Sequence, residues 1–291
     1  MTEWYDYAVI GGGAAGITAA RKLWDSGCRS VVLIDRKTQP GGILHQCAHK
    51  GFGNGLDGPA YAAILTATLP EDLPRLFGTT VTAIRVNRSA DLSDGRVLRF
   101  HELILATGAR ETPAGALPIT GTRPAGIYTA GQMQEMLNCF GYVPETAPAV
   151  IMGGGDIGLI LAWQLAKLGL LVTVVEKETD FTALAKNRDR IRNLNVSAEF
   201  GTTVERVGGM PKIQRVILSD GRVIPCGMLL IATGLKPERE LVSGLGKPEW
   251  LHFAGNCSRI FPVIDQVIRQ GGQAALEAVE HRKKERTKGE G

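Results

Sequence analysis

The residues Val9-Ile10-Gly11-Gly12-Gly13-Ala14-Ala15-Gly16 decide how this chain folds. They form the pattern G-x-G-x-x-G, with an apolar run over 7–10 before it and small, aliphatic residues up to about Trp24 after it. This pattern predicts a strand that turns directly into a helix, where Gly11 permits the tight turn and Gly16 allows helix and strand to pack closely. Gly13 lets the backbone approach a pyrophosphate, which the free N–H groups of the first helical turn attract.

A second apolar run, Val31-Val32-Leu33-Ile34, follows this helix and ends on Asp35. A carboxylate about twenty residues beyond the glycines is placed to accept hydrogen bonds from an adenosine ribose. A lone glycine motif is weak evidence, but the order strand, turn, helix, strand and acid together predicts a dinucleotide-binding module.

The second half of the chain repeats the first. Residues 150–158, Val-Ile-Met-Gly-Gly-Gly-Asp-Ile-Gly, again lead from a strand into G-x-G-x-x-G, and a strand over 171–175 ends on Glu176. Leu229-Leu230-Ile231-Ala232-Thr233-Gly234 also matches residues 103–108 almost residue for residue. Chains with two such modules usually hold two dinucleotides face to face, so that one passes electrons to the other.

The remaining segments predict how the modules are connected. Helices are expected over 59–69 and over 262–280, and strands over 81–86, 97–100, 103–108 and 250–254, whereas the Pro- and Gly-rich stretch 113–126 is typical of a linker. The last strand and helix have no counterpart in the first half, so we expect them to return and complete the first module. The sequence thus predicts an α/β protein with two Rossmann-like three-layer domains, the second inserted in the first, with boundaries at 1–114 plus 241–291 and at 115–240.

Composition is that of an ordinary globular protein, with 44% hydrophobic and 21% charged residues in 291. The net charge of +4 is concentrated in residues 281–291, which hold five Lys or Arg and two Glu. Such a tail could contact nucleic acid or a membrane, but a short frayed helix end is the simpler interpretation. No run approaches the ~18 apolar residues of a membrane span, and no signal region precedes the first strand, so we expect a cytoplasmic protein without a nucleic-acid partner.

At this point the chain resembles the pyridine nucleotide-disulfide oxidoreductase family of two-domain flavoproteins. The resemblance rests on the two glycine motifs, the two Ala-Thr-Gly turns and Ala254-Gly255-Asn256, and it covers nearly the whole chain. It implies that the first module binds FAD and that the second binds NAD(P)H. The FAD positions it implies are Gly11, Gly13, Ala15, Gly16, Asp35, Arg36, Gly42, Val81, Thr107, Gly108, Gly255 and Asn256. The NAD positions it implies are Gly153, Gly155, Asp156, Ile157, Gly158, Glu176 and Gly234.

The chain departs from the best-known members in two places. The thioredoxin and glutathione reductases carry a local cysteine pair, whereas the two closest cysteines here, Cys28 and Cys47, are nineteen residues apart. Related proteins have Gly-Asp where the chain meets the flavin's ribityl group, and this chain has Gly255-Asn256 instead. The asparagine amide can still hydrogen-bond the ribityl hydroxyls. Segments such as GGILHQCAHKGFG resemble a branch with opine oxidase and hydrogen cyanide synthase subunits and oxidoreductases of anaerobic glycerol utilisation, whose members are usually longer.

The implied chemistry is hydride transfer from the nicotinamide to flavin N5. Glu176 favours NADH over NADPH, because a carboxylate accepts both ribose hydroxyls and repels a 2′-phosphate, although the neighbouring Lys177 could tolerate that phosphate. We expect the helix from about Pro262 to point its positive end at the flavin ring.

Cys47 is the one candidate catalytic residue outside the cofactor contacts. It lies twelve residues beyond Asp35, in the segment that passes along the flavin in related proteins, and the alternatives are a redox thiol, a packed cysteine or a substrate-pocket thiol. His45 and His49 flank it as H-x-C-x-H, but three ligands in five residues without a fourth do not predict a metal site. The other four cysteines are interpreted as structural.

Three functions fit the sequence. The first is an FAD-dependent oxidoreductase that takes hydride from NADH and passes electrons to an unidentified acceptor. The second is an electron-transfer subunit that works only with a partner chain, such as an amine or opine-type dehydrogenase subunit. The third is a non-catalytic protein that senses flavin or NAD. Homo-oligomers remain possible in each case.

Overall fold

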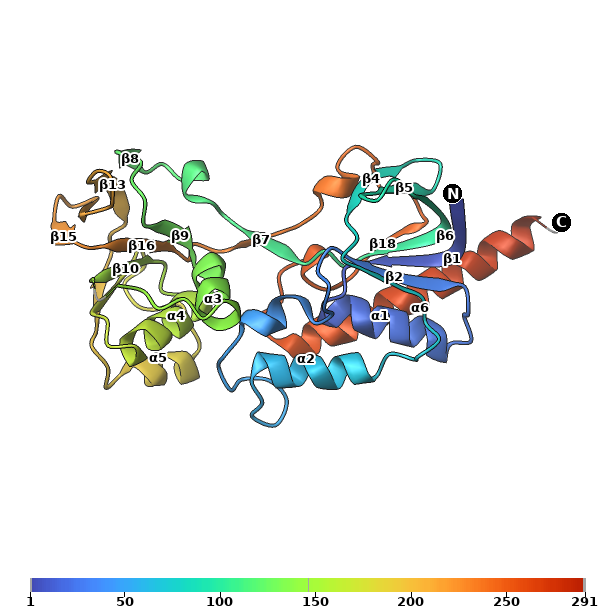
Figure 1. Ribbon diagram of the computed structural model, residues 1–291, viewed down its shortest axis with the longest axis horizontal. Coiled ribbons are helices and arrows are strands. Elements are labelled where there is room, and N and C mark those ends of the chain that lie inside the picture. Colours follow the sequence, from blue (N-terminus) through green and yellow to red (C-terminus); the bar gives the residue numbers. More distant parts are fainter. Residues whose placement is uncertain (1, 146, 290–291) are drawn as a thin grey trace. The chain divides into compact units, whose positions relative to one another are not determined.

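The computed structural model describes residues 2–145 and 147–289, and the chain divides into two compact units (Figure 1). One unit contains the residues up to Arg110 and from Lys236 onward, and the other contains Glu111–Leu235. Both crossings run through short strands, β7 (Ala109–Glu111) and β17 (Leu235–Pro237), which form a two-stranded sheet. The crossings therefore lie four or five residues before the expected boundaries, because they are paired strands instead of a flexible linker.

The first unit is built on a seven-stranded sheet in the order β3-β2-β1-β6-β5-β4, with β18 also paired to β6. Its parallel strands are β1 (Thr2–Ile10), β2 (Val31–Asp35), β3 (Arg75–Phe77), β6 (Val97–Leu105) and β18 (Leu251–Phe253). An antiparallel hairpin of β4 (Val81–Arg85) and β5 (Ser89–Leu92) extends the sheet. The last strand of the chain thus returns to the first unit and pairs parallel to its central strand.

Strand β6 joins two segments that the sequence predicts as separate strands. Residues 97–99 pair with β5, and residues 103–105 pair with β18 on the same edge. The charged residue between them, Glu102, lies inside the sheet and is fully buried. An interruption by charge suggests a strand end in a sequence, but here the carboxylate accepts hydrogen bonds from two part-buried histidines, His252 and His281, which let the strand continue.

The two faces of this sheet are covered differently. Alternating strand residues such as Val9, Leu33 and Ile104 face α1 (Ala14–Asp25) and α6 (Ile264–Gly289). The opposite face packs against the β4–β5 hairpin and the segment 241–250. Figure 1 shows α1, α2 (Gly58–Ala67) and α6 on the same side of the sheet.

Helix α6 is longer than the sequence predicts. It begins two residues after Pro262 and runs to Gly289, so the basic residues from 281 onward extend a helix. Arg282 and Arg286 reach Asp6 on β1. The interpretation of this segment as a frayed end is therefore wrong, because the helix continues through it to Gly289 and two of its cations, Arg282 and Arg286, have a partner on the sheet.

The second unit repeats the layered plan. Its five-stranded parallel sheet has the order β12-β11-β10-β16-β9, with β9 (Ile127–Thr129), β10 (Ala149–Met152), β11 (Val172–Glu176), β12 (Val196–Phe200) and β16 (Met228–Ile231). One face packs against α3 (Ala130–Cys139), α4 (Asp156–Lys167) and α5 (Ala185–Ile191). The other face packs against a four-stranded sheet of β8 (Thr120–Gly121), β13 (Val204–Gly208), β14 (Arg215–Leu218) and β15 (Val223–Pro225).

The stretch 113–126 is more ordered than the predicted linker. It contains a short 3₁₀ helix, η2 (Ala114–Ala116), and β8, which pairs with β13. Three further 3₁₀ helices are η1 (Gly42–Gln46), η3 (Glu240–Val242) and η4 (Gly255–Cys257). Among the described residues, no helix has both the length and the apolar character that crossing a membrane requires.

Candidate functional site

The glycine turn between β1 and α1 is shaped by two glycines that no other residue could replace. Gly11 has φ +110°, and a Cβ on it would lie 2.3 Å from the carbonyl oxygen of Ala106. A Cβ on Gly16 would lie 1.7 Å from the carbonyl oxygen of Gly11. Both approaches are far shorter than van der Waals contact, so these positions fix the strand-to-helix packing that the sequence predicts.

Gly13 has a different role. Apart from its neighbours in the chain, no atom of the described residues lies within 4 Å of the place where its Cβ would be, and its φ of −79° is ordinary for any residue. Its missing side chain therefore leaves open space at the start of α1, where no side chain caps the free N–H groups. Gly42 closes this space on one side, because its own Cβ would lie 3.0 Å from the Cα of Gly13. The structure thus brings two predicted FAD positions, about thirty residues apart, to one cradle that fits a pyrophosphate.

The second unit contains the same turn with nearly the same backbone. Gly153 has φ +114°, and its Cβ would lie 2.4 Å from the carbonyl oxygen of Ala232. The helix-capping residues also agree, with φ −79° and ψ −175° at Gly13 and φ −78° and ψ −177° at Gly155. Each Ala-Thr-Gly motif thus supplies the alanine carbonyl against which the first glycine packs, which explains why both motifs are repeated together.

The acids at the ends of β2 and β11 hold these turns. Asp35 accepts hydrogen bonds from the backbone N–H of Gly12 at 2.5 Å and of Lys37 at 2.7 Å. Glu176 accepts from the N–H of Gly154 at 2.6 Å and of Glu178 at 3.1 Å. Because each carboxylate oxygen can accept more than one hydrogen bond, both acids can hold their turn and still bind ribose hydroxyls.

Asp156 has a local task in addition to its place in the motif. Its Oδ1 accepts from the backbone N–H of Leu184 at 2.8 Å and from the Asn187 side chain at 2.7 Å. The side chain therefore anchors the start of α5, and the atom that α4 offers to a phosphate at this position is the backbone N–H. Ile157 packs, partly buried, in the core between the five-stranded sheet and helices α3, α4 and α5. Gly234 has φ +114° and open space at its Cβ position.

Thr107 and Gly108 secure the end of β6. The Thr107 hydroxyl donates to the carbonyl of Glu238 at 2.6 Å, and the carbonyl of Gly108 accepts from the Glu238 N–H at 3.0 Å. Gly108 has φ +76° with open space at its Cβ position. Among the other FAD positions, the Val81 side chain is buried in the core, so only its backbone can meet a ligand, and Arg36 is exposed beside Asp35.

The Gly255-Asn256 turn meets the start of α1. Gly255 has φ +64°, and its Cβ would lie 2.6 Å from the Cβ of Ala15. Asn256 Oδ1 accepts from the Phe261 N–H at 3.0 Å, so the amide nitrogen is the polar atom left for a ligand. Asn256 is therefore not a simple replacement for Asp at this position. It offers an amide N–H donor to a ligand, whereas an aspartate carboxylate would offer acceptors.

Gln270 on α6 is a positioning residue that the sequence reasoning missed. Its amide nitrogen donates to the Phe253 carbonyl at 2.7 Å, and its amide oxygen accepts from the Gly255 N–H. The next residue, Gly271, packs on Ala15, where a Cβ would lie 2.4 Å from the Ala15 carbonyl oxygen. The pair Gly271-Gly272 inside a helix was the available signal, because glycine there often marks a close backbone approach.

Cys47 and its flanking histidines do not form one cluster. The Cys47 thiol donates to the Ile43 carbonyl at 3.5 Å, His45 Nε2 lies 2.7 Å from the Pro40 carbonyl oxygen, and the His49 ring stacks on Phe52. None of the five cysteines, all of which lie in the described part, forms a disulfide. Burial raises the pKa of Cys226 to about 12 and also raises the pKa of Cys257, so both are protonated packing residues near neutral pH.

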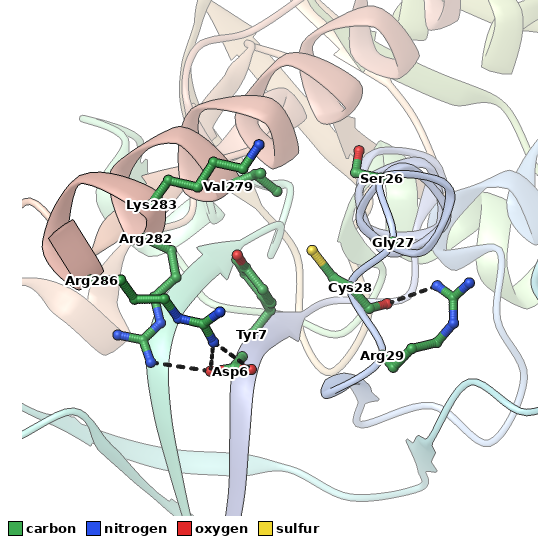
Figure 2. Close-up of a pocket in the computed structure, with 10 residues that line it drawn as sticks. All are labelled: Asp6, Tyr7, Ser26, Gly27, Cys28, Arg29, Val279, Arg282, Lys283 and Arg286. Atoms are coloured by element: carbon green, nitrogen blue, oxygen red, sulfur yellow. Dashed lines mark hydrogen bonds and ion pairs between the residues drawn. The ribbon is translucent and has the colours of Figure 1, made fainter.

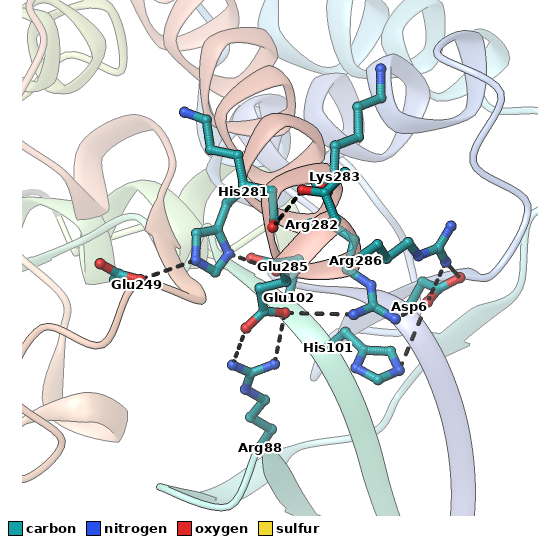
Figure 3. Close-up of polar contacts among 12 residues, drawn as sticks. Asp6, Arg88, His101, Glu102, Glu249, His281, Arg282, Lys283, Glu285 and Arg286 are labelled. Atoms are coloured by element: carbon teal, nitrogen blue, oxygen red, sulfur yellow. Dashed lines mark hydrogen bonds and ion pairs between the residues drawn. The ribbon is translucent and has the colours of Figure 1, made fainter. Parts of the chain in front are cut away.

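A second polar cluster was missed because its members are far apart in sequence. Glu102 accepts from His252 Nε2 at 2.9 Å. It also accepts from His281 Nδ1 at 2.8 Å, and His281 Nε2 lies 3.4 Å from Glu249 (Figure 3). The candidate ligand atoms of Glu102, His252 and His281 all lie within 4.8 Å of one another. The two imidazoles satisfy both oxygens of the buried carboxylate, so the cluster needs no ion to be stable.

Comparisons with known proteins agree with this geometry. Residues 5–250 match the model of the family described as pyridine nucleotide-disulphide oxidoreductase. The chain is 29% identical over 289 residues to the ferredoxin reductase component of chlorobenzene dioxygenase from Cupriavidus sp. (strain PS12), covering 93% of this chain and 70% of that protein. It is 28% identical over 189 residues to one of the opine oxidase subunits of Agrobacterium tumefaciens (strain Ach5), covering 58% of this chain and 36% of that protein.

A solved structure shows the same fold. Thioredoxin reductase from Lactococcus lactis superposes with a TM-score of 0.79 at 22% identity, covering 96% of this chain and 99% of that chain. The predicted fold class and the predicted family are both confirmed. The chain belongs to the pyridine nucleotide-disulphide oxidoreductase family and is an FAD-dependent NAD(P)H oxidoreductase.

Proposed function

We propose that this protein takes hydride from NADH onto FAD and passes the electrons to a separate electron-transfer protein. The observation that carries the proposal is the pair of glycine turns, one in each unit, with the same backbone and with room for a ligand at the third glycine of each, since a Cβ would meet nothing within 4 Å at Gly13 and only Thr182 Oγ1 at 3.7 Å at Gly155. Support for a protein acceptor comes from the similarity to a ferredoxin reductase component over 93% of the chain.

In this proposal the first unit holds FAD. Gly13, Gly42 and the first turn of α1 receive its pyrophosphate, and Asp35 receives its ribose. The remaining contacts are Gly11, Ala15, Gly16, Arg36, the backbone of Val81, Thr107, Gly108, Gly255 and Asn256. When bound, FAD supplies the hydride-accepting ring and the capacity to release electrons to an acceptor.

The second unit holds the nicotinamide nucleotide. Its contacts are Gly153, Gly155, the backbone N–H of Asp156 and Ile157, Gly158, Glu176 and Gly234. Glu176 is 6% exposed and carries the negative charge next to the proposed ribose, whereas Lys177 is exposed and lies 3.4 Å from Glu178. A 2′-phosphate would meet the carboxylate first, so we propose NADH as the donor.

The choice of donor is tested by exchanging one carboxylate for an amide. Glu176→Gln removes the negative charge, and the ratio of kcat/KM for NADH to that for NADPH should fall by about tenfold, the effect of about 1.4 kcal/mol. Glu205→Gln, which changes an exposed carboxylate on β13 of the same unit, is the control and should leave the ratio unchanged. Equal ratios in the wild type and in Glu176→Gln would remove Glu176 from nucleotide choice.

The acceptor is tested by supplying several to the NADH-reduced protein. We expect fast reduction of a ferredoxin and slow reaction with oxygen. Fast turnover with oxygen alone would contradict the protein-acceptor proposal. Reduction of ferredoxin only after a second chain is added would favour the alternative that this protein is an electron-transfer subunit. The similarity to an opine oxidase component supports that alternative.

Cys47 is not needed in this electron path. Its thiol donates a hydrogen bond to the Ile43 carbonyl at 3.5 Å, and its own carbonyl accepts from the Gly58 N–H at 2.8 Å. Cys47→Ser should retain the rates of flavin reduction and reoxidation, measured by stopped-flow absorbance. Loss of either rate with normal FAD content would make the thiol part of the reaction.

A further inference from the structure

A cationic pocket lies in the first unit, lined by residues from both ends of the chain. It has a volume of about 210 Å³ and lies among the middle of β1, the turn that follows α1, and the C-terminal part of α6 (Figure 2). Arg29, Arg282, Lys283 and Arg286 line it, and Asp6 is the one acidic residue in its wall. Because α1 has twelve residues with a rise of ~1.5 Å each, this pocket is roughly 18 Å from Gly13 and is separate from the proposed pyrophosphate cradle.

The four cations are only partly neutralised. Asp6 Oδ1 lies 3.3 Å from one guanidinium nitrogen of Arg282 and 3.3 Å from one of Arg286. Arg282 also reaches Glu285 at 3.5 Å, but Glu285 is already held by Arg88 (Figure 3). Two arginines thus share Asp6, and their combined charge exceeds that of the carboxylate.

The other two cations have no carboxylate partner in the pocket. Arg29 donates to the uncharged backbone carbonyls of Trp24 at 2.8 Å and Cys28 at 3.3 Å. Lys283 forms no ion pair within the part of the chain that the structure describes, whereas its neighbour Lys284 pairs with Glu280 at 2.8 Å. Cations of one sign that surround a concave space attract an anion into it.

Arg282 supplies a second and independent observation. Its Nε atom is buried, and no acceptor among the described residues lies within hydrogen-bonding distance of it. A buried charged donor without a partner is costly, and such groups in native proteins commonly bind an ion or a water. Because this Nε atom has no exposed surface, a ligand in the pocket meets Arg282 through its other guanidinium nitrogens, and the incomplete hydrogen-bond set of the guanidinium leaves part of its positive charge unshared.

We propose that this pocket binds a small phosphate dianion, either inorganic phosphate or the phosphate group of a small metabolite. A dianion balances the charge that Asp6 leaves over, and guanidinium groups bind phosphate oxygens through charge-assisted hydrogen bonds. The volume is several times the ~30 Å³ of one water, which leaves room for one phosphate group with a few waters but not for a macromolecule. The site does not rest on the proposed electron transfer, since none of its residues is among the proposed cofactor contacts.

The test is calorimetric titration of the FAD-loaded full chain with inorganic phosphate, at constant ionic strength set with chloride. Lys283→Gln and Arg29→Gln should each weaken phosphate binding at least fivefold. Lys284→Gln is the matched control, because it removes the same charge from the next residue of the same helix, and it should bind as the wild type does. An unchanged flavin absorbance spectrum in each variant shows that the unit is folded.

Phosphate can also bind the two glycine turns, but that binding is common to all the variants and cannot produce a difference between Lys283→Gln and Lys284→Gln. Equal affinities in these two variants would overturn the proposal. Glucose 6-phosphate and inorganic phosphate, compared in the same titration, distinguish a metabolite from the free ion. Binding to phosphatidylglycerol vesicles that depends on Lys283, without binding of either soluble phosphate, would assign the cations to a membrane surface and would also overturn it.

Discussion

At the scale of single residues, Gly13 and Gly155 separate what each turn needs for folding from what it needs for a ligand. Gly11 and Gly16 are required by packing, since any side chain there collides with backbone. Gly13 and Gly155 have ordinary dihedral angles, and a side chain has room at both, since a Cβ at Gly13 would lie in open space and a Cβ at Gly155 would only touch Thr182 Oγ1 at 3.7 Å. Substitutions at these two positions can therefore remove ligand binding without removing the fold.

This separation gives a prediction for a matched pair of variants. Gly13→Asp places a favourable N-cap residue on α1, which should hold or raise its stability by up to about 1 kcal/mol, while the carboxylate occupies the pyrophosphate space. We expect a folded protein that has lost FAD. Gly155→Asp should instead keep FAD and lose reduction by NADH.

Circular dichroism, flavin content after purification and the rate of flavin reduction check the pair. If Gly155→Asp loses FAD and Gly13→Asp keeps it, the assignment of the two units is reversed. If neither variant changes cofactor binding, the turns do not hold the dinucleotides.

Gln270 carries a second residue-scale prediction. Gln270→Leu leaves the Gly255 N–H and the Phe253 carbonyl without their amide partner, at a cost of about 1–3 kcal/mol for each buried group. The Gly255-Asn256 turn should loosen, and FAD should dissociate at least tenfold faster, with a shift of the flavin absorbance spectrum.

Gln273→Leu is the control, because that amide donates to Glu277 on the exposed face of the same helix. Fluorescence of released FAD gives the rate. The role of Gln270 would be refuted by equal release rates in the two variants.

At the scale of elements, α6 is joined to the sheet by the cluster of Glu102, His252 and His281. Burial lowers the pKa of His281, but its hydrogen bonds and charge interactions with Glu102 and Glu249 outweigh this, and the pKa is raised overall. A raised folded-state pKa contributes stability that is fully present below the ordinary pKa of histidine and is lost as pH rises through the folded value. The join between α6 and β6 should thus weaken toward alkaline pH.

The pH dependence is measurable from thermal unfolding of the FAD-loaded protein. The wild type should melt a few degrees above His281→Asn at about pH 6, and the difference should shrink as the pH rises to about 9. His101→Asn is a control in which the pH dependence should have the opposite sign. Burial lowers the pKa of His101, so the contribution of this histidine to stability is lost as the pH falls. A wild-type advantage over His281→Asn that grows with pH would contradict the raised pKa.

Some secondary-structure elements of this protein are predictable from the sequence, and others are not. The strand-turn-helix units are predictable because glycine spacing and apolar runs are local signals. The sequence predicts β6 as two strands, because Glu102 interrupts the apolar pattern and its partners His252 and His281 are 150 and 179 residues away. The sequence underestimates the length of α6 for the same reason, since the last turns of this helix depend on Asp6 at the other end of the chain.

At the scale of the whole molecule, the internal repeat makes the architecture predictable. Two glycine motifs and two Ala-Thr-Gly turns in the same order define two modules, and the unmatched final strand and helix require a return to the first. The exact crossings are not predictable, because β7 and β17 are short strands whose pairing has no local sequence signal. The role of Gln270 is likewise not predictable, because Gly271-Gly272 beside it indicates only a close backbone approach and the partners of the amide appear once distant segments meet.

The proposed electron path is tested most directly by anaerobic titration of the purified protein with NADH, followed through the visible flavin absorbance. We predict a yellow protein with one FAD per chain that is bleached by one equivalent of NADH and recovers its colour when oxidised ferredoxin is added. A colourless protein, or a bound flavin that NADH does not bleach, would contradict the path from nicotinamide through flavin to a protein acceptor.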